Sequence, residues 1–237
     1  KRQIMMFSAT MNQNVKKLAK EFLSDPVVIE VAQQRSTVKI IDQQIVLVDE
    51  ANKAAALSYI IGSKNYSQVL VFVNMKIEAD KLVEHLELDG LPAACIHGDV
   101  RQTARAKALK KFKAGDIRVL VATDIAARGI DIQLLPIVVN YALPETTADY
   151  THRIGRTGRA GNGGISISFC SKDEEPYWKD IQKLIKVNVK TMKDHPFPWK
   201  EGEPNPDAKP DLRNKKKPEG SNSRKSEASK KNKKRWY

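Results

Sequence analysis

The sequence predicts an α/β domain in which a doubly wound parallel sheet has helices on both faces. Two observations support this prediction. Short apolar runs rich in Val and Ile recur between Gln43 and about Ile185, and helical patterns separate most of them. The runs are apolar at successive positions, which is typical of strands buried on both faces of a parallel sheet. Ligands of such sheets bind at the carboxyl ends of the strands, so motifs that follow strands are the first candidates for a site.

The predicted strands and helices follow one another along this part of the chain. The expected strands are QIVLV (44–48), QVLVFV (68–73), AACI (93–96), RVLVAT (118–123), PIVVNY (136–141) and ISISFC (165–170). The expected helices are Asn52–Ile61, Lys76–Asp89, Gln102–Ala114, Thr147–Gly155 and Asp173–Ile185. This order is that of repeated strand–helix–strand units, whose helices cover the sheet.

Residues 1–32 have a different pattern from the rest of the chain. An apolar run, QIMMFSAT, precedes a helical pattern, and the run VVIEV follows it; the face of the helical pattern is formed by Val15, Leu18, Ala19 and Phe22. We interpret this strand–helix–strand piece as the end of another domain. The predicted divisions are therefore residues 1–32, a linker at 33–42, the α/β domain at 43–190, and an extension with a tail at 191–237.

The positive charge of the chain is concentrated in its tail. Lys and Arg number 41 and Asp and Glu 28, a net charge of +13. From Leu212 onward there are 11 basic residues and two acidic ones, which gives +9. A segment so poor in apolar residues is expected to be disordered, and basic disordered tails usually bind polyanions such as RNA. A tail that only keeps the protein soluble is the alternative.

Cysteine usage and hydropathy give the expected compartment. The two cysteines, Cys95 and Cys170, lie in separate apolar stretches without a metal-like or redox-like partner nearby in the sequence, so we expect buried, reduced thiols and assign no metal ligand. No apolar run approaches the roughly 20 residues of a membrane span. We therefore expect a cytoplasmic protein. Because the first residue is Lys1, we also expect part of a longer product.

The motif HRIGRTGR, from His152 to Arg159, is the strongest chemical signal in the sequence. Three arginines stand three residues apart, a spacing that brings side chains to one face of a helical turn. Converging guanidinium groups suit phosphate oxygens, to which each can bind in a bidentate manner. Gly155 and Gly158 leave room for a backbone or a phosphate to come close, which a merely solvated basic face does not need.

Two further motifs follow predicted strands. ATDIAARGID (122–131) offers the Thr123 hydroxyl and the carboxylates of Asp124 and Asp131, although Asp124 alone also fits a helix cap. IHGDVRQTAR (96–105) places Gln102 and Arg105 in the first turn of a helix, a geometry that suits a nucleic-acid backbone. A capped surface helix is the alternative interpretation of this second motif.

Taken in order, these motifs resemble a known family. The chain is similar to the later half of a DEAD-box RNA helicase in five motifs: Ser8-Ala9-Thr10, VLVFVN, HGDVRQTAR, ATDIAARGID and HRIGRTGR. The amino-acid sequence of these regions resembles the bacterial RhlE-like branch. The resemblance covers about residues 1–185. It implies two RecA-like domains with ATP between them and RNA across both. This chain then holds the end of the first domain and the complete second domain, without the phosphate loop and the magnesium-binding box.

The resemblance also implies how the nucleotide is bound and cleaved. Arg156 and Arg159 are the expected arginine fingers on the γ-phosphate, which contribute about 10³–10⁵ in rate in related systems. Asp131 is expected to accept from the ribose hydroxyl, and Gly129 to lie against the nucleotide. His152 is expected to contact the first domain and to couple ATP to RNA. The magnesium ligands are expected in the first domain.

The remaining implied roles concern RNA and the coupling of the two domains. Arg128 is expected to connect the last two motifs, and Ser8 and Thr10 to link the movements of the domains; Arg153 matches the motif without an implied role. Contacts to the sugar-phosphate backbone are expected from Thr123, Gly98, Gln102, Arg105 and Asn74. Such contacts carry little sequence preference. The implied mechanism is local strand separation, in which ATP and RNA close the domains and hydrolysis reopens them.

A four-residue stretch, Asp49-Glu50-Ala51-Asn52, resembles the magnesium-binding box in sequence. In the family that box precedes Ser-Ala-Thr, but here Ser8-Ala9-Thr10 comes first, so we interpret the stretch as a helix start in which Asp49 caps and Glu50 adds favourable charge. Two functions remain open: part of an ATP-dependent RNA helicase, with the chain alone lacking ATPase activity, or a standalone RNA-binding and annealing module.

Overall fold

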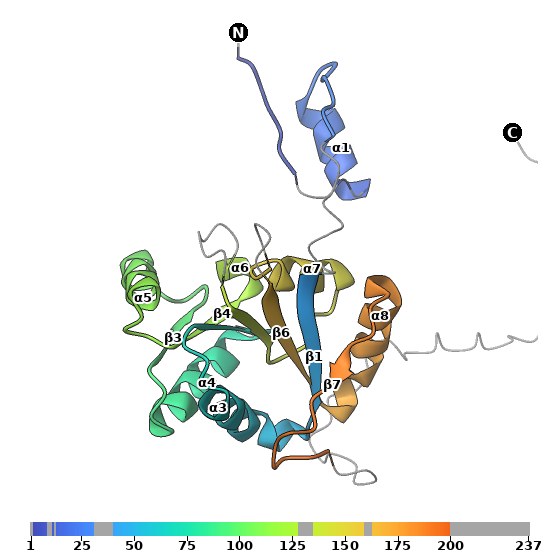
Figure 1. The fold of residues 1–237 in the computed structure, drawn as a ribbon. Coiled ribbons are helices and arrows are strands. Elements are labelled where there is room, and N and C mark those ends of the chain that lie inside the picture. The colour runs from blue at the N-terminus through green and yellow to red at the C-terminus, as the bar shows by residue number, and fades with distance from the viewer. Residues whose placement is uncertain are drawn as a thin grey trace, which may run out of the picture. The chain divides into compact units, whose positions relative to one another are not determined.

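The computed structural model describes residues 2–8, 11, 13–30, 40–127, 135–158 and 163–199. Backbone contacts divide the chain into two units, Lys1–Ser36 and Thr37–Tyr237, and the second contains the sheet (Figure 1). Among the described residues, no helix combines the length and apolar character needed to span a bilayer. The basic tail lies outside the described residues, and so does most of the predicted linker.

The first unit contains one described helix, α1 (Gln13–Phe22). Strands were predicted on either side of this helix. That prediction is wrong for the described residues, since neither 2–8 nor 23–30 forms a strand. A strand needs a neighbour with which to form a hydrogen-bonded ladder, and no described strand pairs with these segments. Their apolar side chains, among them Phe7, Val27 and Ile29, are exposed.

The second unit is built on a parallel sheet with the strand order β3-β4-β2-β5-β6-β1-β7. Every pairing between neighbouring strands is parallel, as the sequence predicts. The strands are β1 (Ile41–Leu47), β2 (Val69–Val73), β3 (Ala93–Ile96), β4 (Val119–Thr123), β5 (Ile137–Asn140), β6 (Gly164–Cys170) and β7 (Lys190–Thr191). β1 starts inside the predicted linker. The short edge strand β7 was not predicted.

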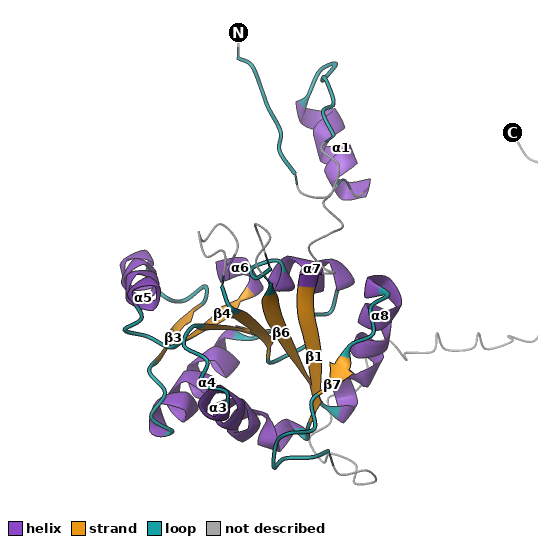
Figure 2. Ribbon diagram, in the orientation of Figure 1, coloured by secondary structure: helices purple, strands orange, loops and turns teal. Residues whose placement is uncertain are grey.

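Helices cover both faces of this sheet (Figure 2). They are α3 (Lys53–Ser63), α4 (Lys76–Leu88), α5 (Gln102–Ala114), α6 (Asp124–Ala127), α7 (Thr147–Ile154) and α8 (Glu175–Ile185), with short 3-10 helices η1 (Glu50–Asn52) and η2 (Lys172–Glu174). The predicted helices form with boundaries shifted by at most two residues, while α6 was missed because one turn is too short to show periodicity.

The alternation of side chains along the strands explains this layering. In β2, Val69, Val71 and Val73 pack in one apolar cluster with α3 and α4. Leu70 and Phe72 point to the opposite face and pack with α5 and α6. Successive side chains of a strand point to opposite faces, so a fully apolar strand can support a helix layer on each side.

The stretch Asp49-Glu50-Ala51-Asn52, which resembles a magnesium-binding box in sequence, forms a helix start, but the predicted cap does not form. Asp49 occupies the position before η1, and its side chain makes no capping hydrogen bond. Glu50 instead forms an ion pair with Lys53, with 2.8 Å between Oε2 and Nζ. The polar contact at this helix start therefore comes from Glu50 and Lys53, the first residue of α3, and not from Asp49.

Candidate nucleic-acid and nucleotide site

The residues predicted to contact RNA lie at neighbouring strand ends. Gly98 follows β3, Thr123 ends β4, and Asn74 follows β2; these three strands are adjacent and parallel. Their carboxyl ends therefore lie along one edge of the sheet. Gln102 and Arg105 occupy the first turn of α5, which directly follows this edge in the chain.

This edge combines accessible groups with groups held in place. A Cβ atom added to Gly98 would meet no heavy atom of the described residues within 4 Å, so their packing does not require a glycine there. Gln102 is exposed, and its Oε1 accepts a long hydrogen bond from Arg105 Nη1 at 3.4 Å. Arg105 Nη2 donates to the carbonyl of Ala126 at 3.0 Å, which connects α5 to the turn after β4.

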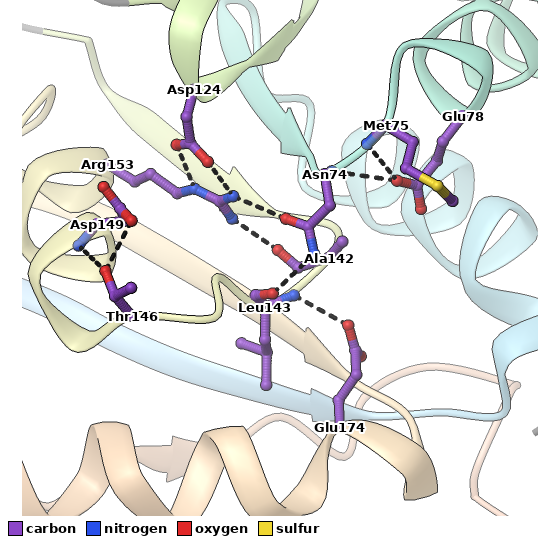
Figure 3. Close-up of polar contacts among 10 residues, drawn as sticks. All are labelled: Asn74, Met75, Glu78, Asp124, Ala142, Leu143, Thr146, Asp149, Arg153 and Glu174. Atoms are coloured by element: carbon purple, nitrogen blue, oxygen red, sulfur yellow. Dashed lines mark hydrogen bonds and ion pairs between the residues drawn. The ribbon is translucent and has the colours of Figure 1, made fainter. Parts of the chain in front are cut away.

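Arg153, the residue without an implied role, binds groups that follow three neighbouring strands, as Figure 3 shows. It comes from α7, and its side chain is only 1% exposed. Its Nε and Nη2 donate to the two carboxylate oxygens of Asp124 at 2.8 and 2.6 Å. Nη1 donates to the carbonyl of Ala142 at 2.7 Å, and Nη2 also donates to Asn74 Oδ1 at 2.9 Å. One guanidinium thereby joins the ends of β2, β4 and β5.

Asn74 belongs to this network as well as to the predicted RNA contacts. Its Oδ1 accepts from Arg153, and its Nδ2 donates to the carbonyl of Leu143 at 3.0 Å. The carboxylate of Glu78 accepts from its backbone amide at 3.2 Å, as Figure 3 shows. The Asn74 side chain thus contacts both α7 and the loop after β5, and a role in binding RNA stays a prediction.

A second polar network supports the same loop. Glu174 Oε1 accepts from the amide of Leu143 at 2.9 Å, and its Oε2 accepts from Lys53 Nζ at 2.6 Å. The Lys53 side chain is 1% exposed. Burial lowers the pKa of Lys53, but the ion pairs with Glu174 and Glu50 outweigh it and raise the pKa above its ordinary value. The lysine therefore stays charged, as a buried ion-pair partner must.

Arg153 and Arg156 do not lie on one helical face, so the expected convergence is wrong for these two residues, while Arg159 lies outside the described residues. Thr146 caps α7, accepting from the amide of Asp149 at 3.1 Å, and the helix ends at Ile154. Arg153 turns inward, whereas His152 is exposed and Arg156 is half-buried beyond the helix end. The helix face that holds Arg153 packs on the sheet, whereas His152 lies on the exposed face of the helix and Arg156 follows the helix end.

The glycine at position 158 serves the fold. Its φ is +65°, and an added Cβ would lie 2.5 Å from Ile41 Cγ1. The motif predicts a glycine that lets a phosphate approach, but packing against β1 and the left-handed backbone already require it. Its neighbour Thr157 is buried and bonds through its hydroxyl to the carbonyl of Leu135.

Several predicted site residues lie outside the described residues. They are Arg128, Gly129, Asp131, Arg159 and Thr10. Ser8 is described and exposed in the first unit. The roles expected of these residues, like those of His152 and Arg156, stay predictions.

Sequence reasoning missed two groups of residues. The first group is the pair formed by Arg153 and Asp124. Each of these residues belongs to one of the two strongest motifs, which marked both as candidates, but the spacing of the motifs did not show that the two side chains meet. The second group is Asp80, Cys95 and His97, which lie together beside β3. Cys170 is buried as expected, but Cys95 is only half-buried. The signal for the cluster was the Cys-x-His spacing at the end of a strand.

Comparison with known proteins places this geometry in a family. Residues 52–161 match the family described as helicase conserved C-terminal domain. The chain is 41% identical over 196 residues to the ATP-dependent RNA helicase RhlB of Pseudomonas syringae pv. tomato, covering 82% of this chain and 49% of RhlB. It is 38% identical over 191 residues to the ATP-dependent RNA helicase FAL1 of Candida glabrata, covering 80% and 48%. The chain thus spans about half the length of these relatives.

Solved structures show the same likeness in three dimensions. The crystal structure of the E. coli DEAD-box protein SrmB bound to regulator of ribonuclease activity A matches with a TM-score of 0.61 and 32% identity, over 64% of this chain and 90% of that chain. S. cerevisiae Dbp5 bound to RNA and ADP BeF3 matches with a TM-score of 0.69 and 32% identity, over 78% and 50%. The sheet of the second unit is therefore RecA-like, as the resemblance implied, and this chain belongs to the DEAD-box helicase family.

Proposed function

We propose that this chain is the C-terminal helicase domain of an ATP-dependent RNA helicase that locally unwinds or remodels RNA. The observation that carries the proposal is the Arg153 network. Arg153 stands beside His152 in the motif expected at ATP, and it bonds to Asn74 and to Asp124, which adjoins Thr123. A displacement of α7 on nucleotide binding is thereby passed to the strand ends expected to bind RNA.

The residues present fit an ATP phosphate in part. Arg156 follows the end of α7 with a half-buried side chain, and a guanidinium there is suited to a γ-phosphate supplied across a domain interface. Asp124 is occupied by Arg153, so the strand-end motif does not offer this carboxylate to magnesium. We therefore assign the magnesium ligands to the first RecA-like domain, together with the phosphate loop that the 237 residues lack. Bound magnesium would neutralise charge on the phosphates.

RNA is the proposed partner, held through its backbone with little sequence preference. The strand-end residues Gly98, Thr123 and Gln102 supply a small residue, a hydroxyl and an amide, which are groups that contact sugar and phosphate. The Dbp5 structure was solved with RNA, which supports the same class of partner here. We further propose that the protein works in the cytoplasm, that the RhlE-like branch is its place in the family, and that the basic tail recruits ribonucleoprotein partners.

A test of the proposed function compares ATP hydrolysis with and without the first domain. The chain alone is expected to show negligible ATPase activity, with or without RNA. Fused behind the first RecA-like domain of RhlB, it is expected to hydrolyse ATP in an RNA-stimulated manner. In that fusion Arg156→Ala is expected to cut turnover by about 10³-fold or more while RNA affinity changes little. RNA-stimulated turnover by the chain alone, or full turnover with Arg156→Ala, would contradict these assignments.

The second candidate, a standalone RNA-binding and annealing module, rests on the tail. The 11 basic residues from Leu212 onward act without nucleotide. If this is the function, the chain alone accelerates annealing of complementary RNA strands at low salt, and the fused first domain adds no ATP dependence. Unwinding that requires ATP in the fusion favours the helicase instead.

A further inference from the structure

Three potential metal-binding side chains meet between α4 and β3, and none of them bonds to Arg153. Asp80 comes from α4, Cys95 lies in β3, and His97 directly follows that strand. Their ligand atoms all lie within 4.8 Å of one another. Cys95 Sγ lies 3.2 Å and His97 Nε2 lies 2.9 Å from Asp80 Oδ1. Because residues i and i+2 along an extended chain point to the same side, Cys95 and His97 both face the helix that carries Asp80.

We propose that Asp80, Cys95 and His97 bind a divalent transition-metal ion, with Zn²⁺ as the preferred species. A thiolate, an imidazole and a carboxylate are the three ligand types that zinc takes in proteins. Bond lengths of about 2.0–2.3 Å in a tetrahedral site hold ligand atoms roughly 3.3–3.8 Å apart. The two separations from Asp80 Oδ1 are shorter than this by less than an ångström, so small side-chain rotations suffice to admit an ion.

The surroundings provide a rigid frame and an open side. Ala79 and Leu82, on either side of Asp80 in α4, are buried in the core, so the helix position is fixed. The His97 side chain is 7% exposed, whereas that of Asp80 is 58% exposed. His97 is thus enclosed by the protein, while the carboxylate of Asp80 faces solvent. This open side leaves room for water as a fourth ligand. Three protein ligands and water are the arrangement of an open zinc site.

Charges near the site do not prevent cation binding. Lys76 lies one turn before Asp80 in α4 and acts on its carboxylate, and the Nζ of Lys76 pairs with Asp99 Oδ2 at 2.5 Å. The pair is exposed, so water screens what remains of its charge. His97 Nδ1 is buried and has no hydrogen-bond partner among the described residues, so the ring is held mainly through Nε2, the atom that would bind the ion.

The competing explanation is a hydrogen-bonded cluster without metal. In that case Asp80 accepts from the Cys95 thiol and from His97. Burial and the Asp80 carboxylate raise the pKa of the Cys95 thiol to about 11, so the thiol keeps its proton when no metal is bound. Metal binding transfers this proton to solvent as the sulfur–metal bond forms, with no change of oxidation state.

The two explanations are separated by titrating the full chain with Co²⁺ and then with Zn²⁺, starting from chelator-treated protein. We expect one Co²⁺ per chain, with the near-ultraviolet charge-transfer band that thiolate ligation gives, and loss of the band when Zn²⁺ is added. Cys95→Ser is expected to abolish the band. Asp80→Asn, a change of an exposed side chain that leaves folding intact, is expected to weaken Co²⁺ binding by about tenfold or more.

Two control variants address the other cysteine and another histidine. Cys170→Ala removes the thiol that is buried in the core, and His85→Gln removes a histidine elsewhere on α4; both are expected to keep the band. Circular dichroism checks that each variant is folded. The proposal is overturned if folded parent protein shows no band at millimolar Co²⁺, or if the band persists in Cys95→Ser.

Discussion

Replacing Arg153 with methionine is the sharpest test of how the site is held together. Arg153 makes four hydrogen bonds, two of them to Asp124, and its guanidinium carbon lies 5.2 Å from the centre of the Phe72 ring. Methionine retains the apolar stem and removes every donor. The carbonyl of Ala142 and the Oδ1 of Asn74 lose a partner, and the carboxylate of Asp124 loses its counter-charge.

The magnitude follows from the burial of the two charges. Removing one partner of a buried ion pair costs about 3–5 kcal/mol, because the other charge stays without compensation. The Asp124 side chain is 29% exposed, so water recovers part of this cost and we expect the lower end of the range. A loss of about 3 kcal/mol corresponds to a fall in Tm of roughly 6–12 °C for a domain of this size.

Urea and thermal unfolding of the whole chain, followed by circular dichroism, measure this loss. Arg101→Met is the matched control, since it makes the same chemical change at an exposed position before α5, and it is expected to stay within about 0.5 kcal/mol of the parent. A double-mutant cycle with Asp124→Asn should give a coupling free energy of about 1–3 kcal/mol. Stability of Arg153→Met within about 0.5 kcal/mol of the parent, or a coupling near zero, would refute the reasoning.

Three further perturbations test other parts of the structure. Gly158→Ala is expected to lower the free energy of unfolding, measured in urea, by about 2 kcal/mol or more, because the left-handed backbone and the contact with Ile41 both oppose a Cβ atom. The control Gly98→Ala, at a position with open space, should lower it by less than about 0.5 kcal/mol. Equal losses in the two variants would contradict this reasoning. Lys53→Met is expected to lower thermal stability by about 3 kcal/mol, because Glu174 loses its counter-charge, and an unchanged Tm would show the pair to be dispensable. Deleting residues 212–237 should make the dependence of log K on log salt for single-stranded RNA shallower by about 0.7 for each phosphate that the tail neutralises, as measured by fluorescence anisotropy, whereas an unchanged slope means that the tail does not hold RNA.

The sequence by itself determined the fold of the second unit. The run VLVFV at β2 is apolar at every position, which requires a cover on both faces, and the helical patterns supply that cover. The family also followed from local sequence, because the motifs after the strands are contiguous strings. These features are local, and local patterns are what periodicity and motif spacing report.

Prediction from the sequence was less accurate where the structure of a segment depends on partners far away in the chain. The runs beside α1 are apolar and β-branched, yet the described residues there form no strand, because a strand forms only against a neighbour. Asp49 stood at a capping position, but its side chain makes no cap, and the adjacent Glu50 pairs with Lys53 instead.

Only the tertiary structure decided which motif residues build the site and which build the fold. Arg153 and Arg156 belong to the same regular spacing of arginines, but α7 ends between them, so Arg153 is buried against Asp124 and Arg156 lies beyond the helix end. Cys95, assigned no partner from the sequence, meets Asp80 across a helix–strand contact. The physical reason is the same in both cases. Spacing fixes which side chains share an element, but pairing between elements depends on how they pack, and packing brings together residues far apart in the chain.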